Sequence, residues 1–249
     1  MSGTCYGLGV GPGDPELLTL KAHRILTAAP VIAYPAPDDG ASFARSIVAD
    51  YLRAEQVEIP IVVPMRVERF PAKAVYDQAA DRIRSHLDSG QDVAVLCEGD
   101  PFFYGSFMYL YQRLAGDYAC EVVPGISSMM AAGAALGQPL AARNDSLTVL
   151  PTTLPDEALE AALAQASAAC FIKVGRHLSR LRAVLDRAGW LAQAHLLERV
   201  SLAEERIMPL ADCAEDVAPY FSIVLAYRGA EDWIADLPLS STEPVSTEC

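Results

Sequence analysis

The stretch Glu98-Gly99-Asp100-Pro101-Phe102-Phe103-Tyr104-Gly105 constrains the fold of this chain most strongly. It follows an apolar segment, 92–97, that is typical of a buried strand, and it precedes a helix-like run over 106–114. In an α/β sheet, ligands bind at the loops that follow the carboxyl ends of strands. Gly99 permits close approach of the backbone to a ligand, and Asp100 offers two acceptor oxygens. Taken alone, the stretch is equally compatible with an ordinary turn.

A second Gly-rich loop, Gly7-Leu8-Gly9-Val10-Gly11-Pro12-Gly13-Asp14-Pro15, ends the first predicted strand, 4–10. Its glycines do not follow the G-x-G-x-x-G spacing of a dinucleotide site, because that spacing places Pro12 or Asp14 at the third glycine. Asp14 is instead typical of a helix N-cap and predicts a helix over 16–28. The loop therefore favours close backbone approach to a ligand other than a pyrophosphate.

A third loop, Val122-Val123-Pro124-Gly125-Ile126-Ser127-Ser128, leads from a short strand into a predicted helix over 129–136. Either Ser127 or Ser128 is a suitable cap for that helix, and the same hydroxyls and free amides are suitable for facing a ligand. Three Gly-rich loops, each following a strand in the first half of the chain, predict one site rather than three independent turns.

These motifs carry a resemblance to a known family. The segments G-x-G-P-G-D-P, E-G-D-P-F-F-Y-G and P-G-I-S-S resemble those of the tetrapyrrole (corrin and porphyrin) methylases, in the same order and spacing over residues 4–230. The resemblance implies two α/β domains with the active site in the cleft between them, a homodimer, and S-adenosylmethionine as methyl donor. The second motif is most similar to the branch that methylates carbon 20 of precorrin-2, which gives precorrin-3A in cobalamin synthesis.

The resemblance also assigns site residues. No residue is marked as an obligatory catalyst, and Asp100, Glu98 and Tyr104 are the candidates for a weak base. Position 98 departs from the Gly-Gly-Asp-Pro form of many relatives, and residues 172–175 depart from a Tyr-Met-Gly-like strand end. S-adenosyl-L-methionine, which leaves as S-adenosyl-L-homocysteine, is expected to contact Pro12, Gly99, Asp100, Phe103, Ser127, Ser128, Lys173, Val174 and Ala226.

The net charge of −13 argues against nucleic acid as a partner and is unfavourable for a tetrapyrrole that carries several carboxylates. Binding of that substrate therefore requires a local concentration of basic side chains. Two clusters are candidates, and either is also compatible with ordinary solvated surface: Arg66, Arg69 and Lys73, and Lys173, Arg176 and His177. From these clusters, Arg66, Arg69 and Arg176 are assigned to the substrate.

Alternating strand and helix patterns predict an α/β fold with a mostly parallel N-terminal sheet and a mixed C-terminal sheet. The break at 137–140 predicts domains over 1–138 and 139–235, with a disordered tail over 236–249. The predicted strands are 4–10, 31–34, 57–63, 92–97, 120–123, 146–150, 169–174, 195–200, 206–211 and 221–227. The predicted helices are 15–28, 42–53, 72–89, 106–115, 128–136, 156–166 and 177–188.

Composition indicates a cytoplasmic protein. No apolar run reaches the length of a membrane span, and a strand predicted at residue 4 leaves no room for a signal peptide. Six scattered cysteines without a C-x-x-C pair predict reduced thiols and no metal site.

Three functions stay open at this point. One is methylation of precorrin-2 at carbon 20. A second is a reaction of the same family on the cobalt-containing counterpart of that substrate, or at another ring position. The third is a module that binds a nucleotide-like ligand without turnover.

Overall fold

The computed structural model describes residues 1–63 and 70–229, with the side chains of 70–72 outside that description. The chain divides into two compact units, Met1–Ser127 and Ser128–Cys249, and each unit contains its own five-stranded sheet. The first sheet is parallel and the second is mixed, which confirms the predicted α/β class. The predicted cleft stays a prediction. Within the described ranges, every helix is too short or too polar to cross a membrane.

The first sheet has the strand order β3-β2-β4-β1-β5. Its central strands are apolar along their whole length because helices cover both faces of a parallel sheet. Register is regular, with Cys5 opposite both Val93 and Cys120. The strands are β1 (Cys5–Gly9), β2 (Val31–Ala36), β3 (Val57–Val62), β4 (Val93–Cys97) and β5 (Cys120–Val123).

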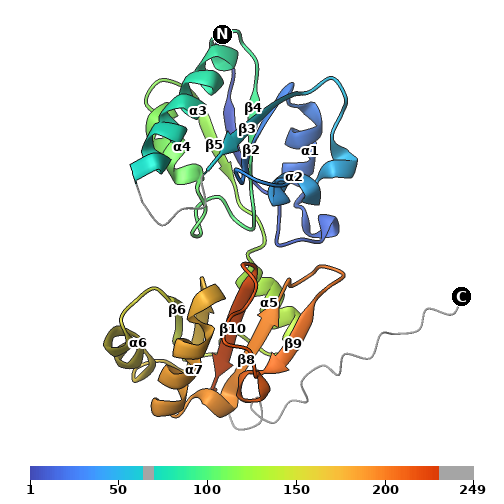
Figure 1. Cartoon of the computed structure of the whole chain (residues 1–249). Coiled ribbons are helices and arrows are strands. Elements are labelled where there is room, and N and C mark those ends of the chain that lie inside the picture. Colours follow the sequence, from blue (N-terminus) through green and yellow to red (C-terminus); the bar gives the residue numbers. More distant parts are fainter. Residues whose placement is uncertain (64–69, 230–249) are drawn as a thin grey trace, which may run out of the picture. The chain divides into compact units, whose positions relative to one another are not determined.

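Two pairs of helices sandwich this sheet (Figure 1). One face packs on α1 (Leu20–Ala28) and α2 (Phe43–Ile47), and the other packs on α3 (Phe70–Asp88) and α4 (Phe107–Leu114). Side chains of β4 alternate between the two resulting cores, as the period of a strand requires.

The single helix predicted over 16–28 is wrong. Asp14 caps only a short 3-10 helix, η1 (Pro15–Leu17), through a hydrogen bond from the backbone N–H of Glu16. The backbone then becomes extended at Leu18, and α1 begins at Leu20 behind its own cap, Thr19. The predicted helix over 42–53 is likewise divided, into α2 and a second 3-10 helix, η2 (Ala49–Tyr51).

The second unit has the sheet order β6-β7-β10-β8-β9, in which β6 and β7 are parallel and the other neighbours are antiparallel. Its helices are α5 (Ser128–Leu136), α6 (Asp156–Leu163) and α7 (Leu178–Arg187), with 3-10 turns η3 (Gly175–His177), η4 (Leu191–Gln193) and η5 (Leu210–Asp212). Its strands are β6 (Leu147–Pro151), β7 (Ala168–Ile172), β8 (Ala194–Glu198), β9 (Arg206–Pro209) and β10 (Ser222–Tyr227).

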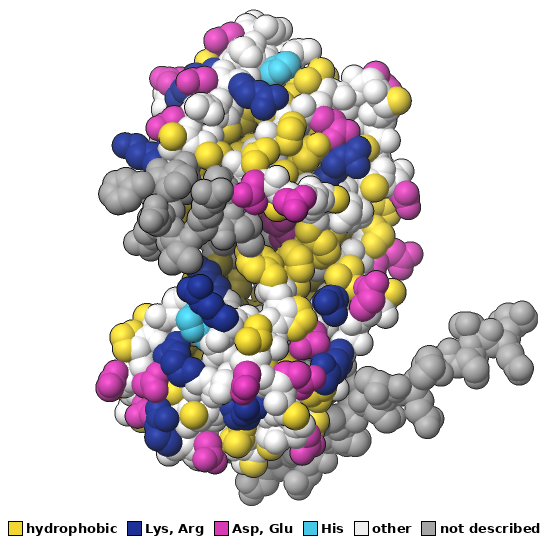
Figure 2. All heavy atoms as spheres, in the orientation of Figure 1, with side chains coloured by type: hydrophobic (Ala, Val, Ile, Leu, Met, Phe, Trp, Pro, Cys, Tyr) yellow, Lys and Arg dark blue, Asp and Glu magenta, His cyan; other side chains and the backbone are white. Residues whose placement is uncertain are grey.

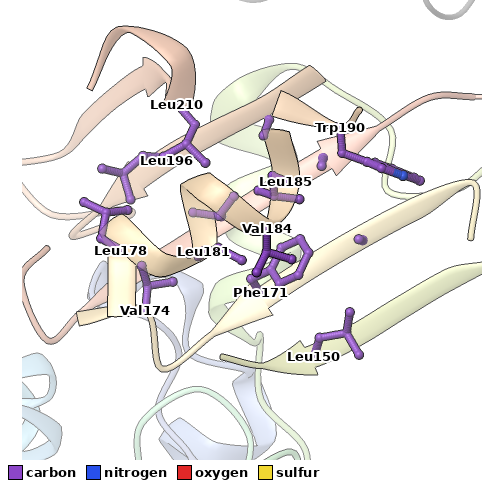
Figure 3. Packing of buried hydrophobic residues seen from close by; sticks show 14 of the residues in the cluster. Leu150, Phe171, Val174, Leu178, Leu181, Val184, Leu185, Trp190, Leu196 and Leu210 are labelled. Atoms are coloured by element: carbon purple, nitrogen blue, oxygen red, sulfur yellow. The ribbon is translucent and has the colours of Figure 1, made fainter. Parts of the chain in front are cut away.

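The core of the second unit lies between its sheet and α7, around Phe171, Leu181 and Trp190 (Figure 3). The guanidinium of Arg228 lies over the Trp190 ring, 4.2 Å from its centroid. Such a contact adds a cation–π attraction to the burial of the indole.

The compact units divide at Ser127, whereas the sequence predicts a domain boundary at residue 138. The predicted break itself is present, because Gly137 has a left-handed backbone (φ 69°) and ends α5. However, α5 packs against β10 and so belongs to the second unit. A glycine that ends a helix marks the end of an element, and only packing decides which unit contains it.

Acidic and basic side chains are interspersed over the visible face of each unit (Figure 2). Many form ion pairs, such as Arg113 with Asp77 and Arg180 with Asp156. The charge of −13 is therefore distributed rather than gathered into one acidic block on that face.

Candidate active site

The three Gly-rich loops meet at the carboxyl edge of the first sheet, because β1 lies between β4 and β5. Gly11 and Gly99 form an isolated antiparallel bridge, in which Gly99 N donates to Gly11 O over 2.8 Å and Gly11 N donates to Gly99 O over 3.4 Å. Both residues have left-handed backbone, with φ of 81° and 64°. Glycine adopts that conformation without steric cost, so the first two loops form one backbone unit.

The backbone of the third loop packs directly against the backbones of the other two. A Cβ atom added to Gly125 would lie 2.1 Å from the carbonyl oxygen of Gly99, and one added to Gly9 would lie 2.5 Å from Cα of Gly125. No real Cβ atom approaches a heavy atom so closely, so glycine is required at these positions. We call Gly9, Gly99 and Gly125 the glycine junction. It places three backbones side by side at the strand ends.

Asp100 ties the second loop to the third. Its Oδ1 accepts from the backbone N–H groups of Phe102 and Phe103, each over 2.9 Å, and its Oδ2 accepts from the N–H of Gly125 over 3.0 Å. The sequence predicts a carboxylate that presents its acceptors to a ligand. The structure instead uses three of its lone pairs within the protein, so Asp100 positions the loops, while its contact with a ligand stays a prediction.

Glu98 directly precedes Gly99 and contacts α2. It is half-buried, and the backbone N–H of Ala44 donates to its carboxyl group. Burial raises the pKa of Glu98, and the hydrogen bonds from backbone groups offset this increase only in part. The raised pKa makes the carboxylate of Glu98 a stronger base, which suits it to accept a proton.

Aromatic side chains border the second loop. Phe102 remains 46% exposed although it stacks on Phe107 and meets Tyr111 edge-on, with ring centroids 6.1 and 5.3 Å away. Tyr104 is also exposed and has a left-handed backbone (φ 57°), which is costly for a residue with a large side chain. Its ring meets Phe103 edge-on at 5.2 Å. An apolar ligand face can pack on these rings.

The other predicted contacts of the first and third loops also lie at this edge. Pro12 is half-buried and directly follows the bridge residue Gly11. Ser127 is buried at the end of the first unit, whereas Ser128 is exposed and begins both α5 and the second unit.

The second-unit residues predicted to bind the donor are not brought together. Lys173 is exposed after the end of β7, with a left-handed backbone (φ 58°), and its carbonyl accepts from the hydroxyl of Thr152. Val174 is fully buried in the core. Ala226 is buried opposite Ala169, near the amino end of β7, whereas Lys173 follows the carboxyl end of that strand. If Val174 and Ala226 contact a ligand, only their backbone groups are available.

The predicted substrate-binding residues are only partly described. Arg66 and Arg69 lie outside the described residues. Lys73 is exposed near the start of α3, and Arg176 is exposed beside His177, with Nε 3.5 Å from the imidazole Nε2. Burial, followed by the charges of Arg180 and Arg176, lowers the pKa of His177, so its imidazole is a poor cation near neutral pH.

Two contributing groups were missed by the sequence analysis. The amide of Ala44 holds Glu98, and no sequence signal marks it, because its role depends on α2 lying beside the end of β4. Thr152 is fully buried and supports the strained Lys173. The position of Thr152, two residues after the predicted strand 146–150, was a usable signal for it.

Three neighbouring parallel strands that end in mutually packed Gly-rich loops define an α/β protein with a candidate ligand site at the carboxyl edge of its sheet. The sequence matches the family described as tetrapyrrole (corrin/porphyrin) methylases over residues 4–213. The chain belongs to the tetrapyrrole methylase family.

Individual relatives are similar over most of this chain. It is 43% identical over 235 residues to the cobalamin biosynthesis protein CobIJ of Mycobacterium tuberculosis. That alignment covers 91% of this chain but only 46% of the relative. The chain thus spans about half the length of that curated relative. It is 41% identical over 231 residues to the precorrin-2 C(20)-methyltransferase of Sinorhizobium sp, covering 90% of this chain and 94% of that protein.

A solved structure supports the same fold. The uroporphyrin-III C-methyltransferase of Thermus thermophilus, in complex with S-adenyl homocysteine, aligns with a TM-score of 0.66 at 25% identity. The alignment covers 90% of this chain and 97% of that one.

Proposed function

We propose that this protein transfers a methyl group from S-adenosylmethionine to carbon 20 of precorrin-2, giving precorrin-3A in cobalamin biosynthesis. The observation that carries this proposal is the glycine junction, built from the family motifs, in a chain that is 41% identical to a precorrin-2 C(20)-methyltransferase over nearly its full length. The 43% identity to a cobalamin biosynthesis protein supports the same pathway.

The residues of the junction fit the proposed donor. Direct backbone contact at Gly9, Gly99 and Gly125 holds in place the three loops that the family resemblance assigns to the donor. S-adenosylmethionine supplies a methyl group on a sulfonium, whose leaving group is a neutral thioether. Because the donor is already activated, this reaction depends mainly on alignment of methyl and acceptor carbon in a dry site.

In this proposal the chain contributes positioning and proton removal. Asp100 fixes the second loop relative to Gly125, and the exposed rings of Phe102 and Tyr104 exclude water from the macrocycle face. After methyl transfer, a proton must leave the methylated carbon. Glu98 is the group whose environment suits it for that step, because burial makes its carboxylate a stronger base.

Donor contacts are proposed for Pro12, Gly99, Asp100, Phe103, Ser127, Ser128, Lys173, Val174 and Ala226, and substrate contacts for Arg66, Arg69 and Arg176. The resemblance to the family supports these assignments. For Val174 and Ala226 the proposal is restricted to backbone groups, since both side chains are buried.

The test is an assay of the purified full chain with S-adenosylmethionine and precorrin-2. We expect the tetrapyrrole to gain the mass of one methyl group, with one S-adenosylhomocysteine formed per product, and the product to carry the new methyl at carbon 20 by NMR. A parallel reaction with the cobalt-containing substrate distinguishes the metal-free from the metal-loaded reaction. Donor binding without methylation of either substrate would favour a binding module and contradict the proposal.

We also propose that the protein is a cytoplasmic homodimer, as its family resemblance implies. The five cysteines within the described residues are free thiols, which suits a reducing compartment. Light scattering coupled to size-exclusion chromatography measures the assembly, and a mass equal to one chain would contradict the dimer.

A further inference from the structure

Cys5 and Cys120 lie opposite each other on neighbouring strands of the first sheet. They are register partners in the parallel pair β1–β5, so their side chains project from the same face. Register partners on adjacent strands are about 4.8 Å apart, within the range of about 4.4–6.8 Å that a disulfide spans between Cα atoms. The pair therefore has the backbone spacing of a disulfide without a rearrangement of the sheet.

The two thiols interact directly. The interaction between the two thiols raises the pKa of Cys5 and lowers the pKa of Cys120. Burial raises the pKa of Cys5 further. Cys120 is thus the member of the pair that more readily becomes a thiolate, which is the nucleophilic form.

Access from solvent also differs between the two. Of the five cysteines that the structure describes, four are buried and only Cys120 is partly exposed, because β5 is an edge strand. An oxidant in solution therefore reaches Cys120 first. Cys5 lies behind it and is placed to complete a bond.

We propose that Cys5 and Cys120 form a reversible disulfide when the protein meets a disulfide oxidant of the glutathione class. The thiolate of Cys120 attacks one sulfur of glutathione disulfide, which forms a mixed disulfide and releases one glutathione. The thiolate of Cys5 then attacks Sγ of Cys120, and a second glutathione leaves. The two thiol protons end on the two glutathione molecules, so two protein thiols are oxidised and one glutathione disulfide is reduced.

The bond would lie at the amino ends of β1 and β5, whereas the glycine junction lies beyond their carboxyl ends. It would join the first strand of the unit to the last one and enclose nearly the whole unit in a covalent loop. Closing a long loop restricts the unfolded chain, so oxidation is expected to raise the Tm of the first unit by about 5 °C or more.

The experiment treats the folded full chain with glutathione disulfide, then blocks remaining thiols under denaturing conditions and digests without reductant. We expect the intact mass to fall by two hydrogen atoms, and mass spectrometry to find the peptide containing Cys5 linked to the peptide containing Cys120. The Tm should rise and should return to its original value with dithiothreitol.

Two variants separate the steps. Cys5→Ser should stop at a stable mixed disulfide carrying one glutathionyl group on Cys120, whereas Cys120→Ser should acquire neither modification at these sites. Cys170→Ser, which removes a buried thiol of the second sheet, and Cys249→Ser are controls that should form the linkage like the unmodified chain. Unchanged thiols, a mixed disulfide that persists on Cys120 in the unmodified chain, or linkage of other cysteines would overturn the proposal.

Discussion

At the scale of single residues, Asp100 shows how a carboxylate can serve a ligand site through its effect on the backbone. It accepts two backbone hydrogen bonds within the second loop and a third, from Gly125, that ties this loop to the third loop. A charged hydrogen bond contributes about 1.5–3 kcal/mol, and a buried donor left without its acceptor adds to the loss. The consequence is that a substitution here changes the site and the local stability together.

We expect Asp100→Ala to weaken donor binding about ten- to a hundredfold and also to lower the Tm. The donor affinity and Tm of Asp100→Asn should lie between those of Asp100→Ala and those of the unmodified chain. Its remaining oxygen can still accept from Phe102 and Phe103, whereas its NH2 group cannot accept from Gly125. Calorimetric titration with S-adenosylmethionine measures the affinity. Asp117→Asn, at an exposed site, is the control, and unchanged donor affinity in folded Asp100→Ala would remove Asp100 from the site.

The glycine junction gives a second prediction at this scale. Gly125→Ala should abolish donor binding and destabilise the first unit by about 1–3 kcal/mol, since its Cβ would meet the carbonyl oxygen of Gly99. Gly99→Val should act similarly, because Gly99 has a left-handed backbone. The matched control is Gly116→Ala, whose Cβ would meet nothing within 4 Å. Thermal melts with and without donor test this, and a normal donor-induced rise in Gly125→Ala would refute it.

At the scale of elements, a polar cluster fastens α2 to the edge of the first sheet. Arg45 forms two hydrogen bonds with Glu58, Nε to Oε2 over 2.6 Å and Nη2 to Oε1 over 2.7 Å, and the hydroxyl of Tyr34 donates to Glu58 Oε2 over 2.6 Å. Arg45 lies in α2, Glu58 in β3 and Tyr34 in β2. Because the amide of Ala44, also in α2, holds Glu98, this cluster indirectly supports the candidate base.

The cluster predicts a dependence of stability on pH. The guanidinium of Arg45 holds the pKa of Glu58 at about 2, below its value of about 4.3 in an unfolded chain. A lowered folded-state pKa stabilises the fold above the unfolded pKa, and this contribution is lost as the pH falls from about 4 to 2. Because both side chains are about one-third exposed, solvent screening keeps the contribution near 1 kcal/mol or less.

Urea unfolding of Glu58→Gln tests this account. At pH 7 the free energy of unfolding should fall by up to about 1 kcal/mol, and the difference from the unmodified chain should shrink toward pH 2. Glu55→Gln, which removes a more exposed partner of Arg53, is the control and should have a smaller effect. A difference that stays constant with pH would show that the charge of Glu58 does not contribute.

Prediction from sequence succeeded for elements that local pattern determines. The strand 120–123 and the helix 128–136 have the predicted ends, and the close spacing of the last strands did indicate a mixed sheet. It failed where pairing across the sheet decides. The separation of Ala226 from Lys173 follows from β10 running antiparallel to β7, and the internal bonding of Asp100 follows from β1 lying between β4 and β5. Neither arrangement has a local signature.

At the scale of the whole molecule, charge and substrate are in apparent conflict. The net charge of −13 repels a polycarboxylate at long range, so binding of the proposed substrate depends on local cations. Most described arginines are already paired with acids, as in the Arg187 contacts with Asp156 and Glu160. Arg176 is exposed and has no acidic partner within the described part of the chain, so its guanidinium is available to a carboxylate of the substrate.

We therefore expect binding of precorrin-2 to weaken as salt rises, while binding of S-adenosylmethionine changes little, because the donor has a small net charge and backbone groups hold it. Screening acts over about 8–10 Å at ordinary ionic strength, so exposed charges are sensitive to it. Arg176→Glu and Arg66→Glu should raise KM for the tetrapyrrole and leave donor affinity nearly intact. Arg24→Glu, on the exposed side of α1, is the control. Indifference to both salt and reversal would assign these cations to ordinary surface.

The glycine junction also limits how damage to it can be repaired. The atoms that obstruct a side chain at Gly125 or Gly9 are Cα, N and carbonyl atoms, which every amino acid possesses. A second substitution elsewhere therefore cannot make room by removing a side chain. In a genetic selection starting from Gly125→Ala, restored growth should come from reversion to glycine or from insertions and deletions that alter a loop's length. Ordinary compensating substitutions should be rare among the survivors.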